Sequence, residues 1–176
     1  DHSKTKAFEN CDLVSLPPNL TTFCGTIHEA TLLSNAFDAS SAPKTGPVPP
    51  YPVANYFPQW LTSLELLTEF RSSTNFTTFA KMLGVQTPHL LHLKMRTVAL
   101  DDLGVSNLPR TLQTLYCEAA PNLTLDCCAL FPRDLTTLVV TWKDGKPIFD
   151  STSPKLSYLP SGLTHLSLDP LDVLET

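Results

Sequence analysis

A short unit of apolar and polar positions recurs along this chain, with the pattern apolar-Pro-x-x-Leu-Thr-x-Leu. Proline cannot donate a hydrogen bond to a β-ladder, and the residues after it alternate between apolar and polar as they do in a half-buried strand. Each copy therefore predicts a turn followed by a short β-strand. Full copies occupy residues 16–23, 57–64, 108–115, 131–138 and 159–166, and a shortened copy occupies residues 88–93.

The last apolar residue of each copy marks the register of its strand. Because side chains alternate across a strand, we expect this residue and the one two positions later to point inward and to stack in columns. The marks are Phe23, Leu64, Leu93, Leu115, Leu138 and Leu166, and they are separated by 41, 29, 22, 23 and 28 residues. Their inward partners from the second mark onward are Leu66, Met95, Cys117, Val140 and Leu168.

The unit and its spacing resemble those of the leucine-rich-repeat family, and the Leu-Pro-x-x-Leu-Thr wording is most similar to short repeats of protist surface proteins and some bacterial effectors. The resemblance covers residues 57–176 and extends to residues 16–23. It implies a leucine-rich-repeat solenoid, with short parallel strands on a concave face and loops and short helices on the convex side. The alternative, a Leu-rich helical domain, would not tolerate proline at the start of each unit.

The chain departs from that family three residues after the last strand leucine. The usual residue there is Asn or Cys, whose side chain bonds the backbone of neighbouring turns. None of these positions holds Asn or Cys in this chain. They hold Glu69, Val98, Ala120, Lys143 and Leu171.

The spacing divides the chain into three segments. Residues 1–33 are expected to form an N-terminal cap and the first repeat, and residues 57–176 the remaining leucine-rich repeats. Between them, residues 34–56 form a Ser/Pro-rich insertion that accounts for the gap of 41 residues. Its prolines favour an extended polyproline conformation, so the segment either lies over the repeats or serves as a proline-motif ligand.

Two local features are expected outside the strands, the first of them on the convex side. Residues 75–83 predict a short helix whose inward face carries Phe76, Phe79 and Leu83. The neighbouring acids Asp101 and Asp102 predict a turn or a helix cap, because adjacent carboxylates do not converge on one substrate atom.

Composition excludes several classes of protein. The chain has 176 residues and 42% apolar content, enough to bury a core, and its apolar residues are mostly leucine rather than the Val and Ile of ordinary sheets. Its 12 Lys and Arg against 17 acidic residues supply no basic face for nucleic acid. No uninterrupted apolar stretch is long enough to span a bilayer. The opening Asp1-His2-Ser3-Lys4 is typical of a processed or excised chain.

The five cysteines are expected to form disulfides rather than a zinc site. No Cys-x-x-Cys occurs, and no His lies at ligand spacing from a Cys pair. Cys11 and Cys24 flank the first repeat, where a bridge would clip the N-terminal cap. Cys117 could reach Cys127 or Cys128, and its alternative is a free, buried thiol.

Three sequons point to N-glycosylation, at Asn19, Asn75 and Asn122. Together with the expected bridge in the cap and the Ser/Thr/Pro-rich stretches, they favour a secreted or cell-surface glycoprotein.

No catalytic or cofactor motif is present. The Gly-x-Ser-x-Gly elbow, the P-loop, Gly-x-Gly-x-x-Gly and His-Glu-x-x-His are all missing from the sequence, so we expect no enzymatic activity, cofactor or metal. His92 and His165 occupy the same register in two repeats. Two strands separate them, which places them roughly 14 Å apart and too far to share an ion.

The expected working part is therefore the outward surface of the strands, which would bind a partner. Its residues most suited to recognition are Glu65, His92, Lys94, Arg96, Tyr116, Glu118, His165 and Asp169. The resemblance implies a non-catalytic extracellular repeat glycoprotein that recognises a protein or glycan or packs into a surface assembly, since residues 169–174 add no polar cap to the last repeat. The alternative is an intracellular substrate-recognition module of an effector-type protein, with reduced cysteines.

Overall fold

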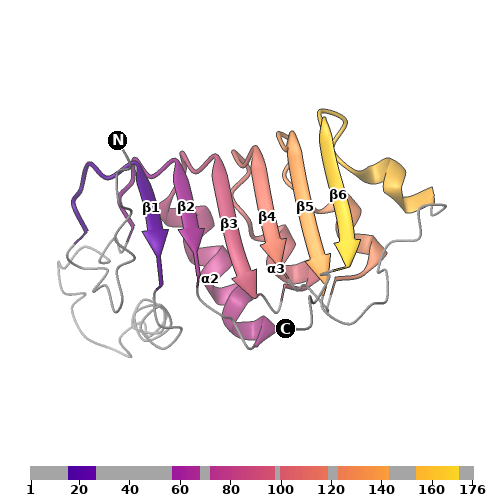
Figure 1. The fold of residues 1–176 in the computed structure, drawn as a ribbon, viewed down its shortest axis with the longest axis horizontal. Helices are drawn as coiled ribbons and strands as arrows, with labels where there is room; N and C mark the ends of the chain where they lie inside the picture. The colour runs from indigo at the N-terminus through magenta and orange to yellow at the C-terminus, as the bar shows by residue number, and fades with distance from the viewer. Residues whose placement is uncertain are drawn as a thin grey trace, which may run out of the picture.

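The computed structural model describes residues 16–26, 57–67, 72–97, 100–118, 123–142 and 154–170. Within them lies one open sheet of six parallel strands whose order in space is their order in the chain (Figure 1). All neighbouring strands pair in parallel. The strands are β1 (Thr22–Gly25), β2 (Ser63–Leu66), β3 (His92–Thr97), β4 (Thr114–Glu118), β5 (Thr137–Trp142) and β6 (His165–Pro170).

Helical segments connect several of the strands. They are α2 (Ser73–Gln86), α3 (Asp102–Ser106) and the 3₁₀ helices η2 (Leu125–Ala129) and η3 (Pro154–Tyr158). In Figure 1, α2 and α3 lie behind the sheet, so the helices cover one face of it. This arrangement of parallel strands and few helices is compatible with a repeat solenoid.

The register predicted from the repeat is confirmed at the marks of the six described strands, and between β3 and β4 it shifts beyond Met95, where Thr97 pairs with Glu118. Phe23 pairs with Leu64, and the pairing continues mark by mark to Leu138 and Leu166. The first five marks are buried, whereas Leu166 in β6 is 43% exposed. A second column runs beside the first, in which Leu66, Met95, Cys117 and Val140 are fully buried. These two columns form the centre of the hydrophobic core.

The proline in each unit has a direct structural role. In five repeats its carbonyl accepts a hydrogen bond from the backbone N–H three residues later, as in Pro109 to Leu112 at 3.3 Å, and this closes a turn before the strand. In the shortened third copy Thr87 takes the place of proline and accepts the bond from Leu90. Thr87 is buried, and its hydroxyl donates to the carbonyl of Leu83 at 2.8 Å.

The threonine of the unit joins one turn to the next. The Thr136 hydroxyl donates to the carbonyl of Gln113 at 3.1 Å, and the Thr164 hydroxyl donates to the carbonyl of Thr136 at 3.1 Å. The same relation holds between Thr62 and the carbonyl of Thr21. Each of these carbonyls also accepts two backbone N–H groups from the following repeat. The Leu-Thr step therefore forms a hydrogen-bond ladder where the strands begin.

The predicted helix is confirmed and is longer than expected. Residues 73–86 form α2, and Phe76, Phe79 and Leu83 are buried in the core as predicted. Ala80, about one helical turn before Leu83, completes the buried face of the helix. The helix ends at Gln86, and its C-cap Thr87 begins the next repeat turn.

Asp101 is a helix cap, as predicted. Its side chain accepts a hydrogen bond from the Gly104 backbone N–H at 2.7 Å at the start of α3, and the Thr77 hydroxyl of α2 donates to the same oxygen at 3.3 Å. One carboxylate thus satisfies a helix terminus and ties α3 to α2.

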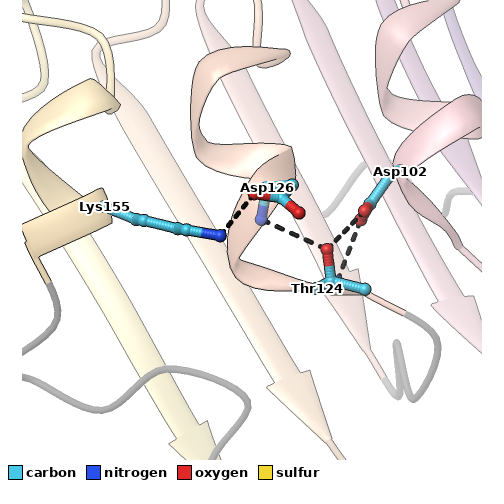
Figure 2. A network of polar contacts seen from close by, with 4 residues as sticks. All are labelled: Asp102, Thr124, Asp126 and Lys155. Atoms are coloured by element: carbon cyan, nitrogen blue, oxygen red, sulfur yellow. Dashed lines mark hydrogen bonds and ion pairs between the residues drawn. The ribbon is translucent and has the colours of Figure 1, made fainter.

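A chain of polar contacts links α3 to η2 and η2 to η3 (Figure 2). Asp102 accepts hydrogen bonds from both the backbone N–H and the hydroxyl of Thr124, and the Thr124 hydroxyl in turn accepts from the Asp126 N–H at 3.1 Å. Lys155 of η3 then forms an ion pair with Asp126 at 2.5 Å. These contacts hold α3, η2 and η3 in sequence behind the strands.

Several expectations fall outside the described residues. They concern the insertion at residues 34–56, the cap residues before Leu16, Asn122, and the positions where the family carries Asn or Cys, namely Glu69, Val98, Ala120, Lys143 and Leu171.

Candidate functional site: the outer face of the sheet

The face of the sheet turned away from the core, here called the outer face, carries the side chains that alternate with the buried columns. Its middle row is in register across all six strands. Since parallel neighbours lie about 4.8 Å apart, side chains of one row contact each other directly. The row consists of Cys24, Glu65, Lys94, Tyr116, Val139 and Ser167.

Four residues of this row interact from strand to strand. Lys94 Nζ lies 2.7 Å from Glu65 Oε1, and it also lies over the Tyr116 ring at 5.8 Å from the ring centroid. On the other side of Glu65, the Cys24 thiol donates to Oε2 at 3.4 Å. Lys94 therefore makes an ion pair and a cation–π contact at once.

The charge states of this row follow from these contacts. The hydrogen bond from Lys94 lowers the pKa of Glu65 below its usual value, so Glu65 is an anion at neutral pH. Burial, followed by the hydrogen bond to Glu65, raises the pKa of Cys24. Cys24 is consequently a protonated donor and not a reactive thiolate.

The remaining predicted binding residues are placed as follows. His92 and Arg96 are exposed on β3 beside Lys94. His165 is exposed on β6 in the same row as His92, with Thr114 and Thr137 between them, which confirms the predicted separation by two strands. Glu118 and Asp169 lie in β4 and β6, but their side chains are outside the described part of the structure. The structure thus brings Glu65, Lys94 and Tyr116 together and leaves His165 apart.

An aromatic pair that the sequence did not predict lies at the turn edge of the sheet, the edge where the repeat turns precede the strands. The rings of Trp60 and His89 are stacked, with centroids 5.3 Å apart and planes 5° from parallel, and Trp60 is 51% exposed. Both are the third residue of their repeat turn, as the bonds from Leu61 to Pro58 and from Leu90 to Thr87 show. An alignment of the turns alone would have placed them side by side.

The cysteines differ from expectation. Cys24, Cys117, Cys127 and Cys128 are free thiols, so the structure has no bridge from Cys117 to Cys127 or Cys128, and the alternative of a buried free Cys117 is the one observed. Cys117 occupies the second inward column, where burial raises the pKa of its thiol above its ordinary range. Burial has the same effect on the pKa of Cys127. Cys24 is free as well, so the expected bridge from Cys11 to Cys24 is not formed either.

Among the described residues, no group of three or more His, Cys, Asp or Glu side chains could hold a metal ion. None of the helices described here is long and apolar enough to cross a bilayer.

Comparison of the chain with known protein families, with curated proteins and with solved structures found no match in any of the three.

The Glu65–Lys94 contact predicts a pH dependence. Because the folded-state pKa of Glu65 is lowered, its stabilising contribution is present above the pKa of the unfolded chain and is lost as pH falls through the lower folded value. Replacing Lys94 with Met keeps the aliphatic stem and removes the charge. We expect the pKa of Glu65 to rise and the free energy of unfolding at pH 6 to fall by less than about 1 kcal/mol, since the pair is partly exposed.

Carbon-detected NMR titration of the Glu65 carboxyl group measures this pKa. Lys81→Met is the matched control, because Lys81 is exposed on α2, away from the outer face. An unchanged Glu65 pKa in Lys94→Met would contradict the assigned cause.

Proposed function

We propose that this chain is a leucine-rich-repeat solenoid that acts as a non-catalytic recognition protein and binds a protein or glycan partner through the outer face. Support for the repeat architecture comes from the agreement between the sequence unit, the closed turns and the strand register. A concave curvature of the outer face is part of the proposal.

The observation that carries the proposal is the interacting row of Glu65, Lys94 and Tyr116. These side chains come from the neighbouring strands β2, β3 and β4, and they lie on the face opposite the inward columns, which pack with Phe76 and Phe79 of α2 in the core. Aromatic residues and arginine are enriched at binding hot spots, and Tyr116 and the exposed Arg96 supply both types here. Mutual contacts hold the row in place before a partner arrives, which lowers the ordering cost of binding.

A matched pair of charge reversals tests this proposal. Arrayed glycans and arrayed extracellular proteins would first be screened with the purified chain, and the affinity of each captured partner measured. Arg96→Glu on the outer face should weaken that binding by at least about tenfold, equivalent to about 1.4 kcal/mol. Lys81→Glu on α2 should leave it unchanged, because Lys81 is exposed away from the sheet. Equal effects of the two substitutions would place the binding surface elsewhere.

The proposed location is outside the cell, as a secreted or surface-displayed glycoprotein. Asn19 supports it, because it is exposed in the first repeat turn, where an attached glycan would meet no core residue. Asn75 is less accessible, since it lies partly buried in the first turn of α2.

One observation favours the alternative, an intracellular recognition module of an effector-type protein. The four described cysteines are all free, as they are in a reducing compartment. Peptide mapping with thiol alkylation of the chain from its native source separates the two cases. Glycosylated sequons or an oxidised Cys11–Cys24 pair support the extracellular proposal, whereas unmodified sequons with five alkylated thiols support the intracellular one.

Self-assembly at the β6 edge, which would extend the stack of repeats perpendicular to the strands, is a further part of the proposal. Leu166 of β6 supports it, because this register mark is 43% exposed while its five counterparts are buried. Light scattering over a range of protein concentrations would detect such an assembly.

A further inference from the structure

Trp60 is an unusual feature of the turn edge. It is one of two tryptophans in the chain and is half exposed at the third position of its turn, where the other repeats carry Asn, His, Thr, Asp and Gly. An exposed indole leaves a large apolar surface in water, which costs free energy that burial against a partner would recover. His89 of the following repeat covers one face of the ring.

The opposite ring face points toward the preceding repeat. Trp60 and His89 occupy equivalent positions in successive turns, and their rings are nearly parallel, so the stacking direction runs from strand to strand. The bond from Leu20 to Pro17 shows that the third residue of the preceding turn is Asn19. Thr62 is joined to the carbonyl of Thr21 through its N–H and its hydroxyl, so these two turns are aligned, at a strand spacing of about 4.8 Å.

Asn19 is the first residue of the sequon Asn19-Leu20-Thr21, whose middle residue is not proline. The Asn19 side chain is exposed, whereas Leu20 is partly buried against the core and holds the turn through its N–H. A sugar attached to Asn19 would therefore leave the fold undisturbed and emerge beside the face of Trp60 opposite His89.

We propose that Asn19 carries an N-linked glycan whose first N-acetylglucosamine stacks on the face of Trp60 not covered by His89. In the attachment step, Asn19 Nδ2 bonds to the anomeric carbon of a lipid-linked oligosaccharide donor. The bond from that carbon to the donor's diphosphate oxygen breaks, and the Nδ2 proton is released while the lipid diphosphate leaves. The C–H face of the pyranose then packs on the indole, completing a sugar–Trp60–His89 stack. This inference rests on the extracellular part of the proposed function.

The experiment uses the chain expressed in a secretory eukaryotic host. Peptide mapping establishes occupancy at Asn19, Asn75 and Asn122, and an endoglycosidase then trims each glycan to one N-acetylglucosamine. Proton NMR measures the acetyl methyl resonance of the sugar on Asn19, assigned by its loss in Asn19→Gln. We expect the ring current of Trp60 to shift this resonance upfield, and we expect Trp60→Ala to abolish the shift.

Two variants make the result specific. His89→Ala removes the other stacking partner of Trp60 and should preserve the upfield shift, because the sugar lies on the opposite ring face. Trp60→Phe keeps a smaller ring and should reduce the shift without abolishing it, which also covers the case in which Trp60→Ala does not fold.

The outcomes separate this inference from the proposed function. An unmodified Asn19 overturns the inference, and if Asn75 and Asn122 are unmodified too, the glycoprotein proposal falls with it. A modified Asn19 whose methyl resonance is the same with and without the Trp60 ring overturns the stacking alone and leaves the glycoprotein proposal standing.

Discussion

Leu115→Ala is expected to lower the free energy of unfolding by about 2 to 5 kcal/mol. Leu115 is fully buried on β4, with Leu93 and Leu138 beside it in the first inward column. Removing three heavy atoms there forfeits the transfer free energy of a buried side chain and leaves a cavity that the two neighbours cannot fill, because both are held by strand pairing. Urea unfolding followed by circular dichroism measures the loss.

The chain contains a matched control at the same register. Leu166 occupies the equivalent position on β6 but is 43% exposed, so Leu166→Ala should cost well under half as much as Leu115→Ala. The slope of free energy against urea should be unchanged in both variants. Equal losses at the two positions would contradict a continuous buried column that thins out at β6.

Gly104→Ala is expected to destabilise the protein by about 1 to 3 kcal/mol, although alanine normally favours a helix over glycine by about 0.8 to 1 kcal/mol. A Cβ on Gly104 would lie 2.7 Å from the Phe76 ring and 3.2 Å from Asp101 Oδ1. Phe76 is fully buried and Asp101 is fixed by its cap to the Gly104 N–H, so neither can move aside cheaply. The overpacking therefore outweighs the helix propensity.

Gly162→Ala is the control for this prediction. A Cβ at Gly162 would approach Leu135 O only to 3.8 Å, an ordinary contact. We expect a change between zero and about 1 kcal/mol of stabilisation, because alanine restricts the unfolded chain. Thermal and urea unfolding of the two variants measure the contrast, and a Gly104→Ala protein as stable as Gly162→Ala would refute the close packing of α3 on Phe76.

The repeat unit was enough to predict the six described strands and the register of their marks. The reason is that inward positions alternate with a period of two and that proline marks each turn, so each mark from Phe23 to Leu166 has only one place in the sheet. The helix at Phe76 and Phe79 was also predictable from its apolar spacing. Its full extent to Gln86 was not, because the last turn ends against the next repeat turn at Thr87.

Two identical segments that contain glycine show where prediction from the local sequence fails. Leu83-Gly84-Val85 and Leu103-Gly104-Val105 have the same sequence, yet Val85 is exposed and Val105 is buried. The two segments lie at different distances from their next turn, so their helices present different faces to the core. Such packing depends on the connection lengths between strands and on the side chains behind the sheet.

The sequence alone determined the strands, the buried columns and the turns, because these depend on spacing within one repeated unit. Only the tertiary structure decided which outward side chains meet: Lys94 between Glu65 and Tyr116, and Trp60 on His89. The same holds for the four described cysteines, whose free state does not follow from their positions in the sequence. The physical reason is that these contacts join residues of different repeats, and they form only once the sheet has brought those repeats within one strand spacing.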